Sequence, residues 1–306
     1  MNASDVVVAL DVGGTGIKCG LVDGSGALRY AERHATDAAR GPDAVIATIL
    51  DLAESLAGKA QAGGDTPRAV GIVVPGIVDE PAGVAVWSAN VGFRGVPLRD
   101  LVSARLALPA ALGHDVRAGG LAEARLGAGR DAEHVLFVAI GTGIAAAHVV
   151  SGRGFAGAHG AAGELGHIVV RPGGRPCACG GHGCLEAVAS AAAVGRRYAE
   201  LTGKPATAAA VAGLAGAGDA GGAQVWRETV DALADGLLTA QALYDVEVIV
   251  VGGGLAEAGD ALLDPLRAAL RERITFHREP RLARATLGDE AGCLGAALLA
   301  LDTLED

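Results

Sequence analysis

Three of the chain's five cysteines lie within eight residues, at Cys177, Cys179 and Cys184. Two histidines are candidates for a fourth ligand, His182 inside this cluster and His167 ten residues before it. Three thiolates and one imidazole form a closed tetrahedral zinc site of the structural type. A disulfide between Cys177 and Cys179 would close a very small, strained ring. The spacing therefore predicts a structural zinc site and leaves the choice of histidine open.

Three Gly-rich turns, each after an apolar run, form a second set of candidates. Such turns expose backbone N–H groups and let a phosphate approach closely, so three in one chain indicate a bound nucleotide. Asp11 lies where the first apolar run meets its turn and can orient Mg²⁺ with its water shell. The alternative, an aspartate satisfied by N–H groups of the turn, is equally compatible with the sequence. The nucleotide candidates are Asp11, Gly13, Gly14, Thr15, Lys18, Gly141, Thr142, Gly143, Gly253 and Gly254.

The elements that must position these residues follow a repeated pattern. Residues 5–34 contain short apolar runs separated by Gly-rich turns, which predicts successive antiparallel strands rather than a dinucleotide or P-loop motif. The pattern returns at 134–154, where GTGI of 14–17 recurs at 141–144. The order of elements indicates a duplicated unit and two α/β lobes.

Helices and further strands are predicted after each of these regions. The apolar spacing favours helices over 43–62, 97–108, 225–245 and 287–301, and buried strands over 69–79, 109–115 and 246–255. A short strand is also expected at 168–172. Asp115 falls where a strand ends and a helix begins, a position that suits either a helix cap or a base in phosphoryl transfer.

The composition excludes several classes of protein. The chain has 306 residues and a formal charge of −10, which argues against binding to nucleic acid or to an anionic membrane. Hydrophobic residues make up 51% and aromatics only 3%, so the core must consist of Val, Leu, Ile and Ala. The first residues resemble no signal peptide, and the apolar run at 135–150 is short for a membrane span. We expect a soluble, cytoplasmic protein.

Several segments together resemble the ROK family of bacterial sugar kinases and sugar-responsive repressors. They are DVGGTGIK (11–18), GTGI (141–144), GELGH (163–167), CACGGHGCLE (177–186), VGGGLAEAGDALLDPLR (251–267) and LGDEAGCLGAALLA (287–300). The resemblance covers nearly the whole chain in the right order. It implies an α/β actin-like, hexokinase-like ATPase fold, with two lobes around a cleft from a duplicated βββαβαβα-type unit. Residues 1–115 with 289–306 would form the small lobe, and 116–288 the large lobe with the zinc loop.

The resemblance also implies an activity and its residues. It implies an ATP-dependent kinase that phosphorylates the 6-hydroxyl of glucose or a glucose-like hexose, with Mg²⁺, a structural Zn²⁺ and Asp115 as general base. It selects His167 as the fourth zinc ligand, and it implies a homodimer or homotetramer. The residues implied to bind the sugar are Asn90, His114, Asp115, Glu164, His167 and Glu186.

Some positions depart from the family pattern. His114 and Arg117 stand where the family commonly has asparagines, and Ala145–Ala147 follow the second glycine turn. The sugar is therefore open, with N-acetylmannosamine, N-acetylglucosamine, mannose, fructose or an amino sugar such as kanosamine as alternatives, and polyphosphate as an alternative donor. A non-catalytic sugar-binding protein is a further alternative. A repressor is disfavoured, because its DNA-binding segment would precede the first glycine turn, which here begins at Asp11.

Overall fold

The computed structural model describes residues 2–305 and divides into two compact units. The first unit runs to Leu126 and also takes in Gly154–Ala162 and the chain from Asp289 on. The second unit comprises Gly127–Arg153 and Gly163–Gly288. These two units are groups of residues that pack closely with one another. The lobes expected from the sequence, 1–115 with 289–306 and 116–288, remain a prediction.

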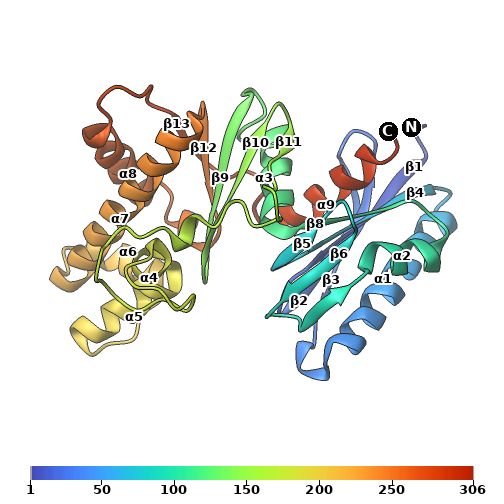
Figure 1. Cartoon of the computed structure of the whole chain (residues 1–306), viewed down its shortest axis with the longest axis horizontal. Helices are drawn as coiled ribbons and strands as arrows, with labels where there is room; N and C mark the ends of the chain where they lie inside the picture. Colours follow the sequence, from blue (N-terminus) through green and yellow to red (C-terminus); the bar gives the residue numbers. More distant parts are fainter. Residues whose placement is uncertain (1, 306) are drawn as a thin grey trace. The chain divides into compact units, whose positions relative to one another are not determined.

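The first unit is built on a five-stranded sheet of order β3-β2-β1-β4-β8 (Figure 1). Its β1 consists almost entirely of buried residues, because helices cover both faces of the sheet. A small second sheet, of order β5-β6-β7, completes the unit. The strands are β1 (Asp5–Val12), β2 (Gly16–Asp23), β3 (Leu28–Ala35), β4 (Thr66–Val74), β5 (Ile77–Asp79), β6 (Val84–Ser88), β7 (Phe93–Val96) and β8 (Ala110–His114).

Helices α1 and α9 pack on the sheet of this unit. In α1, Val45, Ile49, Ala53, Leu56 and Ala60 are buried at helical spacing and join the core formed by the even-numbered residues of β1. Helix α9 packs against β1 and β4 and against α3. The helices are η1 (Ala38–Arg40), α1 (Pro42–Ala62), α2 (Leu98–Leu106), α3 (Asp115–Arg125), η4 (Gly288–Glu290) and α9 (Ala291–Asp302).

The second unit has a sheet of order β11-β10-β9-β12-β13, with β9 and β12 parallel. Its hydrophobic core lies between this sheet and the helices α4 to α8. The strands are β9 (His134–Ile140), β10 (Ile144–Val150), β11 (Arg153–Gly154), β12 (Val248–Gly252) and β13 (Arg281–Arg284). The helices are η2 (Leu165–His167), α4 (Leu185–Ala189), α5 (Ala191–Thr202), α6 (Ala208–Gly216), α7 (Ala220–Tyr244), η3 (Gly254–Ala258) and α8 (Asp260–Arg273).

The two large sheets have the same strand order, which agrees with the predicted duplication. In each sheet the first strand lies third in spatial order, pairs antiparallel with the second strand and pairs parallel with the fourth. Both glycine turns join the first and second strands. The first is closed by a hydrogen bond from Gly13 N to Gly16 O (2.9 Å), and the second by one from Gly141 N to Gly143 O (2.9 Å).

Three expected elements differ from the structure. The buried strand expected over 69–79 is two strands, β4 and β5, which lie in different sheets. The expected strand at 168–172 is absent, and this stretch holds only a single bridge between Val169 and Cys184. Its N–H groups at Val170 and Arg171 donate instead to Gly183 O, both at 3.0 Å, so the segment is tied to the cysteine loop and joins no sheet. The helix expected to begin at 225 begins at Ala220, because Asp219 caps it by accepting a hydrogen bond from Gly222 N (2.7 Å).

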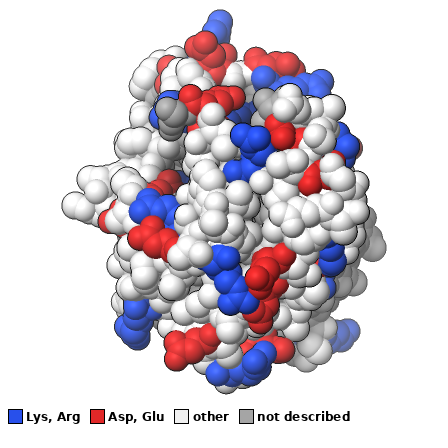
Figure 2. Space-filling model, turned by 90° about the vertical axis from the view of Figure 1, so that its right-hand side faces the viewer, with Lys and Arg blue, Asp and Glu red and all other residues white. Residues whose placement is uncertain are grey.

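The surface shown in Figure 2 carries basic and acidic side chains side by side. On that face the lysines and arginines lie near acidic groups and form no continuous basic stripe. Among residues 2–305, the structure contains no helix with both the length and the apolar character required to cross a lipid bilayer.

Candidate functional site

Asp11 lies at the end of β1, opposite Lys18 of β2. Burial raises the pKa of the Asp11 carboxyl to about 6; Lys18 opposes this shift, and the carboxylates of Asp115 and Asp289 add to it. The first turn of α9 approaches the carboxylate closely, since a β-carbon on Gly292 would lie 2.3 Å from Asp11 Oδ2. The structure therefore holds an acceptor-rich, partly buried carboxylate beside the first glycine turn.

This raised pKa predicts a stability effect of Asp11→Asn. The folded state binds the Asp11 proton more tightly than the unfolded chain does. Protonation of Asp11 therefore stabilises the fold below the ordinary carboxyl pKa of 3.8, and this stabilisation is lost as pH rises through about 6. Above pH 7 the asparagine variant should be more stable by about 1–3 kcal/mol. Denaturant unfolding at pH 8 and at pH 4 checks this: the gain should shrink at pH 4, and the exposed control Asp131→Asn should show no gain at either pH.

Asn90 lies against the first glycine turn. A β-carbon on Gly14 would lie 3.1 Å from the Asn90 β-carbon, and the Asn90 side chain is exposed. The turn itself is held by Thr36, whose hydroxyl donates to Gly13 O (2.6 Å) and whose N–H donates to Thr15 O (3.2 Å). The first unit thus places one predicted sugar ligand next to the predicted phosphate loop.

Asp115 is the first residue of α3, directly after β8, as the sequence predicts. Its Oδ1 accepts a hydrogen bond from Val116 N (2.7 Å), and its side chain is 29% exposed. The residue that caps α3 is His114, whose Nδ1 accepts from Arg117 N (3.4 Å). Because His114 supplies the cap, Asp115 is not needed for that purpose, and its carboxylate is available for chemistry.

Glu80 and Arg117 support this junction, and sequence reasoning missed Glu80. The buried Arg117 contacts Glu80 Oε1 through Nε (3.0 Å) and donates from Nη1 to Gly160 O (2.9 Å). The same Glu80 oxygen accepts from His114 N (3.3 Å). Glu80 follows a short strand and has no recognisable motif around it, so no signal in the sequence could have identified it.

The four predicted zinc ligands come together in the second unit. The ligand atoms of His167, Cys177, Cys179 and Cys184 all lie within 4.8 Å of one another. Cys177 Sγ is 3.7 Å from His167 Nδ1, and Cys179 Sγ is 3.7 Å from Cys184 Sγ. Zinc–sulfur bonds of about 2.3 Å in a tetrahedron give sulfur–sulfur distances of about 3.8 Å, so the spacing fits zinc. It also excludes a disulfide, whose sulfurs would be bonded at about 2.05 Å.

The chemistry of the thiols agrees with a metal. Burial raises the pKa of Cys184 to about 12, with Cys179 and Cys177 adding to the shift, so without a cation its thiol keeps its proton. A hydrogen bond from the Gly181 backbone lowers the pKa of the exposed Cys179. Zinc displaces such protons when it binds. His182, the competing ligand in the sequence, is exposed and lies outside the cluster.

His167 also faces Glu164. Glu164 directly precedes the short helix η2 and His167 is its last residue, and His167 Nε2 lies 3.7 Å from Glu164 Oε2. One ring nitrogen therefore points to the cysteines and the other to a carboxylate, the arrangement that fixes the tautomer of a metal-bound histidine. The exposed Glu164 keeps acceptor capacity for a ligand.

Glu186 is tied to the second glycine turn, a link that the sequence did not predict. Its Oε2 accepts from Ile144 N (2.9 Å), and a β-carbon on Gly143 would lie 2.5 Å from that oxygen. Only glycine at 143 allows this approach. The second unit thus places Glu186 two residues after Cys184 of the cysteine–histidine cluster and ties it to a predicted phosphate loop.

The third turn, at Gly253 and Gly254, leads into η3, which contacts β9 and β12.

A second group of possible metal donors lies in the first unit. Cys19, Glu32 and His34 place one donor atom each within 4.8 Å of one another. Glu32 Oε2 already contacts the Lys59 ammonium at 2.5 Å, and burial raises the pKa of the Cys19 thiol to about 12. Since a lysine neutralises the carboxylate, we assign no metal there.

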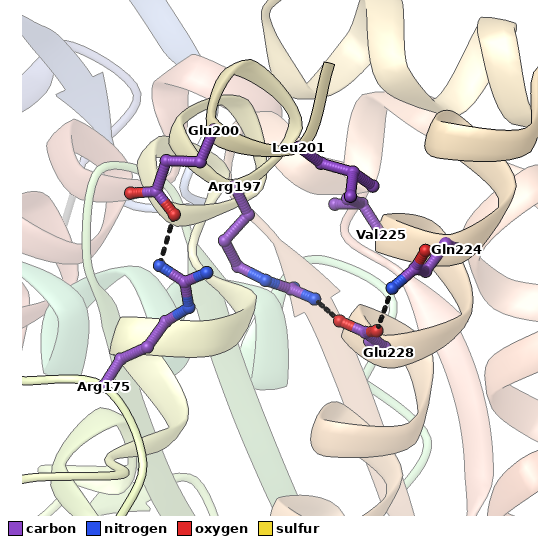
Figure 3. Close-up of a pocket in the computed structure, with 7 residues that line it drawn as sticks. All are labelled: Arg175, Arg197, Glu200, Leu201, Gln224, Val225 and Glu228. Atoms are coloured by element: carbon purple, nitrogen blue, oxygen red, sulfur yellow. Dashed lines mark hydrogen bonds and ion pairs between the residues drawn. The ribbon is translucent and has the colours of Figure 1, made fainter. Parts of the chain in front are cut away.

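The second unit also holds a cavity of about 250 Å³ lined by ion pairs (Figure 3). Arg175 Nη1 contacts Glu200 Oε2 at 2.5 Å, and the buried Arg197 pairs with Glu228. Arg197 Nη1 also donates to Val188 O (2.9 Å) and to Thr229 Oγ1 (3.2 Å). Because each of these charged groups is already paired, we assign this cavity a structural role.

Removal of the Arg197 side chain should therefore destabilise the protein. Arg197→Met would remove the donor from Val188 O, Thr229 Oγ1 and one oxygen of the Glu228 carboxylate, at a cost of about 2–4 kcal/mol in unfolding free energy. The neighbouring Arg196 is exposed, so Arg196→Met is the matched control and should change stability little. Urea unfolding followed by circular dichroism measures both, and equal stability of the two variants would show that this network contributes nothing.

The duplicated sheets, the three glycine turns and the carboxylate at the β8–α3 junction define an actin-like ATPase of the hexokinase type. The chain belongs to the ROK family, whose profile matches residues 7–303. It is 34% identical over 312 residues to a glucokinase of Thermotoga maritima, covering 95% of this chain and 96% of the relative. An N-acetylmannosamine kinase of Escherichia fergusonii is 32% identical over 297 residues, covering 96% and 97%.

A solved structure agrees with these relatives. The ROK family glucokinase of Streptomyces griseus, in complex with glucose and AMPPNP, is 30% identical and superposes with a TM-score of 0.78, covering 97% of this chain and 99% of that one. The chain is therefore a sugar kinase, a phosphotransferase of the hexokinase and glucokinase type.

Proposed function

We propose that this protein is an ATP-dependent kinase that phosphorylates the 6-hydroxyl of glucose or a glucose-like hexose. The observation that carries the proposal is the Asp115 carboxylate, which lies at a strand–helix junction and is partly exposed. His114 caps α3, so Asp115 is not needed as the cap. The glucose and AMPPNP bound to the relative from Streptomyces griseus support the choice of substrates, since AMPPNP is an analogue of ATP.

In this proposal Asp115 accepts the proton of the attacking hydroxyl. Phosphoryl transfer is catalysed mainly by positioning and by charge stabilisation, with one carboxylate orienting and deprotonating the nucleophile. Asn90, His114, Glu164, His167 and Glu186 would bind the sugar hydroxyls. The three glycine turns and Lys18 would bind the phosphates. Mg²⁺, with Asp11 near its water shell, would neutralise charge on the phosphates.

We further propose that His167, Cys177, Cys179 and Cys184 hold a structural zinc ion. Zinc would supply a rigid cross-link between the cysteine loop and η2. It would have a structural role and would take no part in phosphoryl transfer. His167 would then be fixed in one tautomer. Glu164 precedes the cysteine loop in sequence and Glu186 follows it, so the metal would restrain the chain close to both glutamates. A cytoplasmic location and a homodimeric or homotetrameric assembly complete the proposal.

A kinase for another hexose is the second candidate, because His114 replaces the family's asparagine and because the chain is 32% identical to an N-acetylmannosamine kinase. A coupled assay of ADP release with Mg-ATP separates the candidates when it includes glucose, mannose, fructose, N-acetylmannosamine, N-acetylglucosamine and kanosamine. The proposal predicts the highest kcat/KM with glucose. A higher value with an N-acetyl sugar would favour the second candidate, and polyphosphate in place of ATP would test the donor.

A further inference from the structure

We propose that Thr36 is a positioning residue for ATP, whose hydroxyl turns the peptide between Gly13 and Gly14 so that the Gly14 N–H faces the phosphates. The inference rests on the proposed function, in which the first glycine turn binds phosphate. It starts from two hydrogen bonds that tie Thr36 to this turn. Thr36 Oγ1 donates to Gly13 O (2.6 Å), and Thr36 N donates to Thr15 O (3.2 Å).

Thr36 lies outside the turn and is itself held in place. It is buried and directly follows β3, the strand that pairs with β2. Its backbone N–H bonds to Thr15 O, and this bond does not depend on the side chain at position 36. The position of the hydroxyl is therefore set by the sheet and not by the turn.

The hydroxyl fixes the orientation of the Gly13–Gly14 peptide. A trans peptide directs its C=O and its N–H to opposite sides, and the structure contains no cis peptide bond among residues 2–305. Because Gly13 O points to Thr36, the N–H of Gly14 points away from Thr36. A glycine on each side lets this peptide rotate when nothing holds it. Over the same residues Gly13 O accepts no second hydrogen bond, so the Thr36 hydroxyl alone restrains this carbonyl.

The same contacts leave the donors of the turn available for an anion. Within the described part of the chain, neither Gly14 N nor Thr15 N makes a hydrogen bond, and Thr15 is exposed. Successive N–H groups in a turn can bind one phosphate together. The carbonyl oxygens of Gly13 and Thr15 would repel a phosphate, but both are directed to Thr36. Thr36 therefore orients the turn with its donors toward the ligand.

The second glycine turn has the same kind of restraint. Gly13 and Gly141 are equivalent, since each directly follows the first strand of its sheet and donates its N–H across the turn. The carbonyl oxygen of Gly141 is also held from outside its hairpin, by the N–H of Ala191 in α5 (2.9 Å). The restraint thus occurs in both copies of the duplicated unit. In the first copy the donor is a side chain, which a substitution can remove.

Two substitutions separate the hydroxyl from the rest of Thr36. Thr36→Val replaces the hydroxyl with a methyl group of similar size, whereas Thr36→Ser keeps the hydroxyl. We expect Thr36→Val to lower kcat/KM for Mg-ATP and the affinity for Mg-AMPPNP about tenfold, because Gly14 N–H no longer donates to a charged phosphate. The sugar KM should not change, and Thr36→Ser should stay near the wild type. The control is Thr48→Val, since Thr48 Oγ1 donates to Ala44 O (2.9 Å) inside α1, and this variant should keep both values.

The measurements are KM for each substrate with the best sugar of the panel, isothermal titration calorimetry with Mg-AMPPNP, and ¹⁵N–¹H spectra of the wild type with and without Mg-AMPPNP. The amide signal of Gly14 should shift when Mg-AMPPNP saturates the wild type. This spectrum decides the question should Thr36→Val fail to fold, and an unshifted Gly14 signal would refute the inference.

The remaining outcomes separate the inference from the function on which it rests. Wild-type affinity of Thr36→Val for Mg-AMPPNP overturns this inference alone. Equal losses of sugar and nucleotide affinity, or a loss that Thr36→Ser shares, would make Thr36 a structural residue and overturn it as well. No binding of Mg-AMPPNP by the folded wild type overturns the proposed function and this inference with it.

Discussion

Asp115→Asn should lower kcat with the best sugar by about 10³-fold, while the protein stays folded and still binds the sugar. An amide cannot accept the proton of the attacking hydroxyl, and general-base catalysis contributes about 10²–10⁴-fold. The amide keeps the size of the carboxylate and its oxygen can still accept from Val116 N, so the fold should not change. Steady-state kinetics and sugar binding by isothermal titration calorimetry measure the two effects separately.

The control for this variant is Asp100→Asn. Asp100 also lies in the first turn of a helix, α2, but it is exposed and pairs with its neighbour Arg99 (3.0 Å). Its substitution should leave kcat unchanged. Near-normal turnover by Asp115→Asn would remove Asp115 from the mechanism, and loss of sugar binding together with kcat would make it a substrate ligand rather than a base.

Cys184→Ser should remove bound zinc and weaken sugar binding. Cys184 is buried and begins the segment that leads to Glu186, so loss of the metal should loosen Glu186 and His167 together. Substitutions around metal sites commonly cost 10–100-fold in metal affinity or activity, and we expect a rise in sugar KM of about tenfold or more with a lower melting temperature. Zinc content by plasma mass spectrometry, melting temperature and KM form the test.

Cys293→Ala is the matched control, because Cys293 is a buried cysteine in α9 of the other unit, outside the cluster. It should keep one zinc per chain and a normal KM. Fully active, freshly purified wild-type protein that contains no zinc would end the structural-zinc account, and chelation without any change in stability would do the same.

Much of the fold was predictable because its signals are local. Buried apolar runs followed by glycine turns marked β1, β9 and β12, and the recurrence of the opening pattern indicated a duplicated unit, with which the shared strand order of the two sheets agrees. The clustering of the three cysteines was likewise predictable from their spacing, and the family resemblance added His167, seventeen positions before Cys184. The expected strand at 168–172 was wrong, since apolar content does not reveal that its N–H groups donate to Gly183.

The contacts that shape the site were less predictable, because they join distant residues. Glu80 reaches Arg117 and His114, and Glu186 reaches Ile144, over 34 to 42 positions of sequence. No spacing rule covers such pairs. His114 was visible in the sequence as an unusual residue before Asp115, but its role as the cap of α3 depends on the orientation of its ring.

The most direct test of the central claim is to identify the product. Protein, Mg-ATP and glucose should yield hexose 6-phosphate and ADP in equal amounts by ³¹P NMR, and 6-deoxyglucose, which lacks the reacting hydroxyl, should yield no phosphorylated sugar. ATP consumption at the same rate with and without each hexose of the panel, with no phosphorylated sugar formed by folded protein, would contradict the claim that this chain is a hexose kinase.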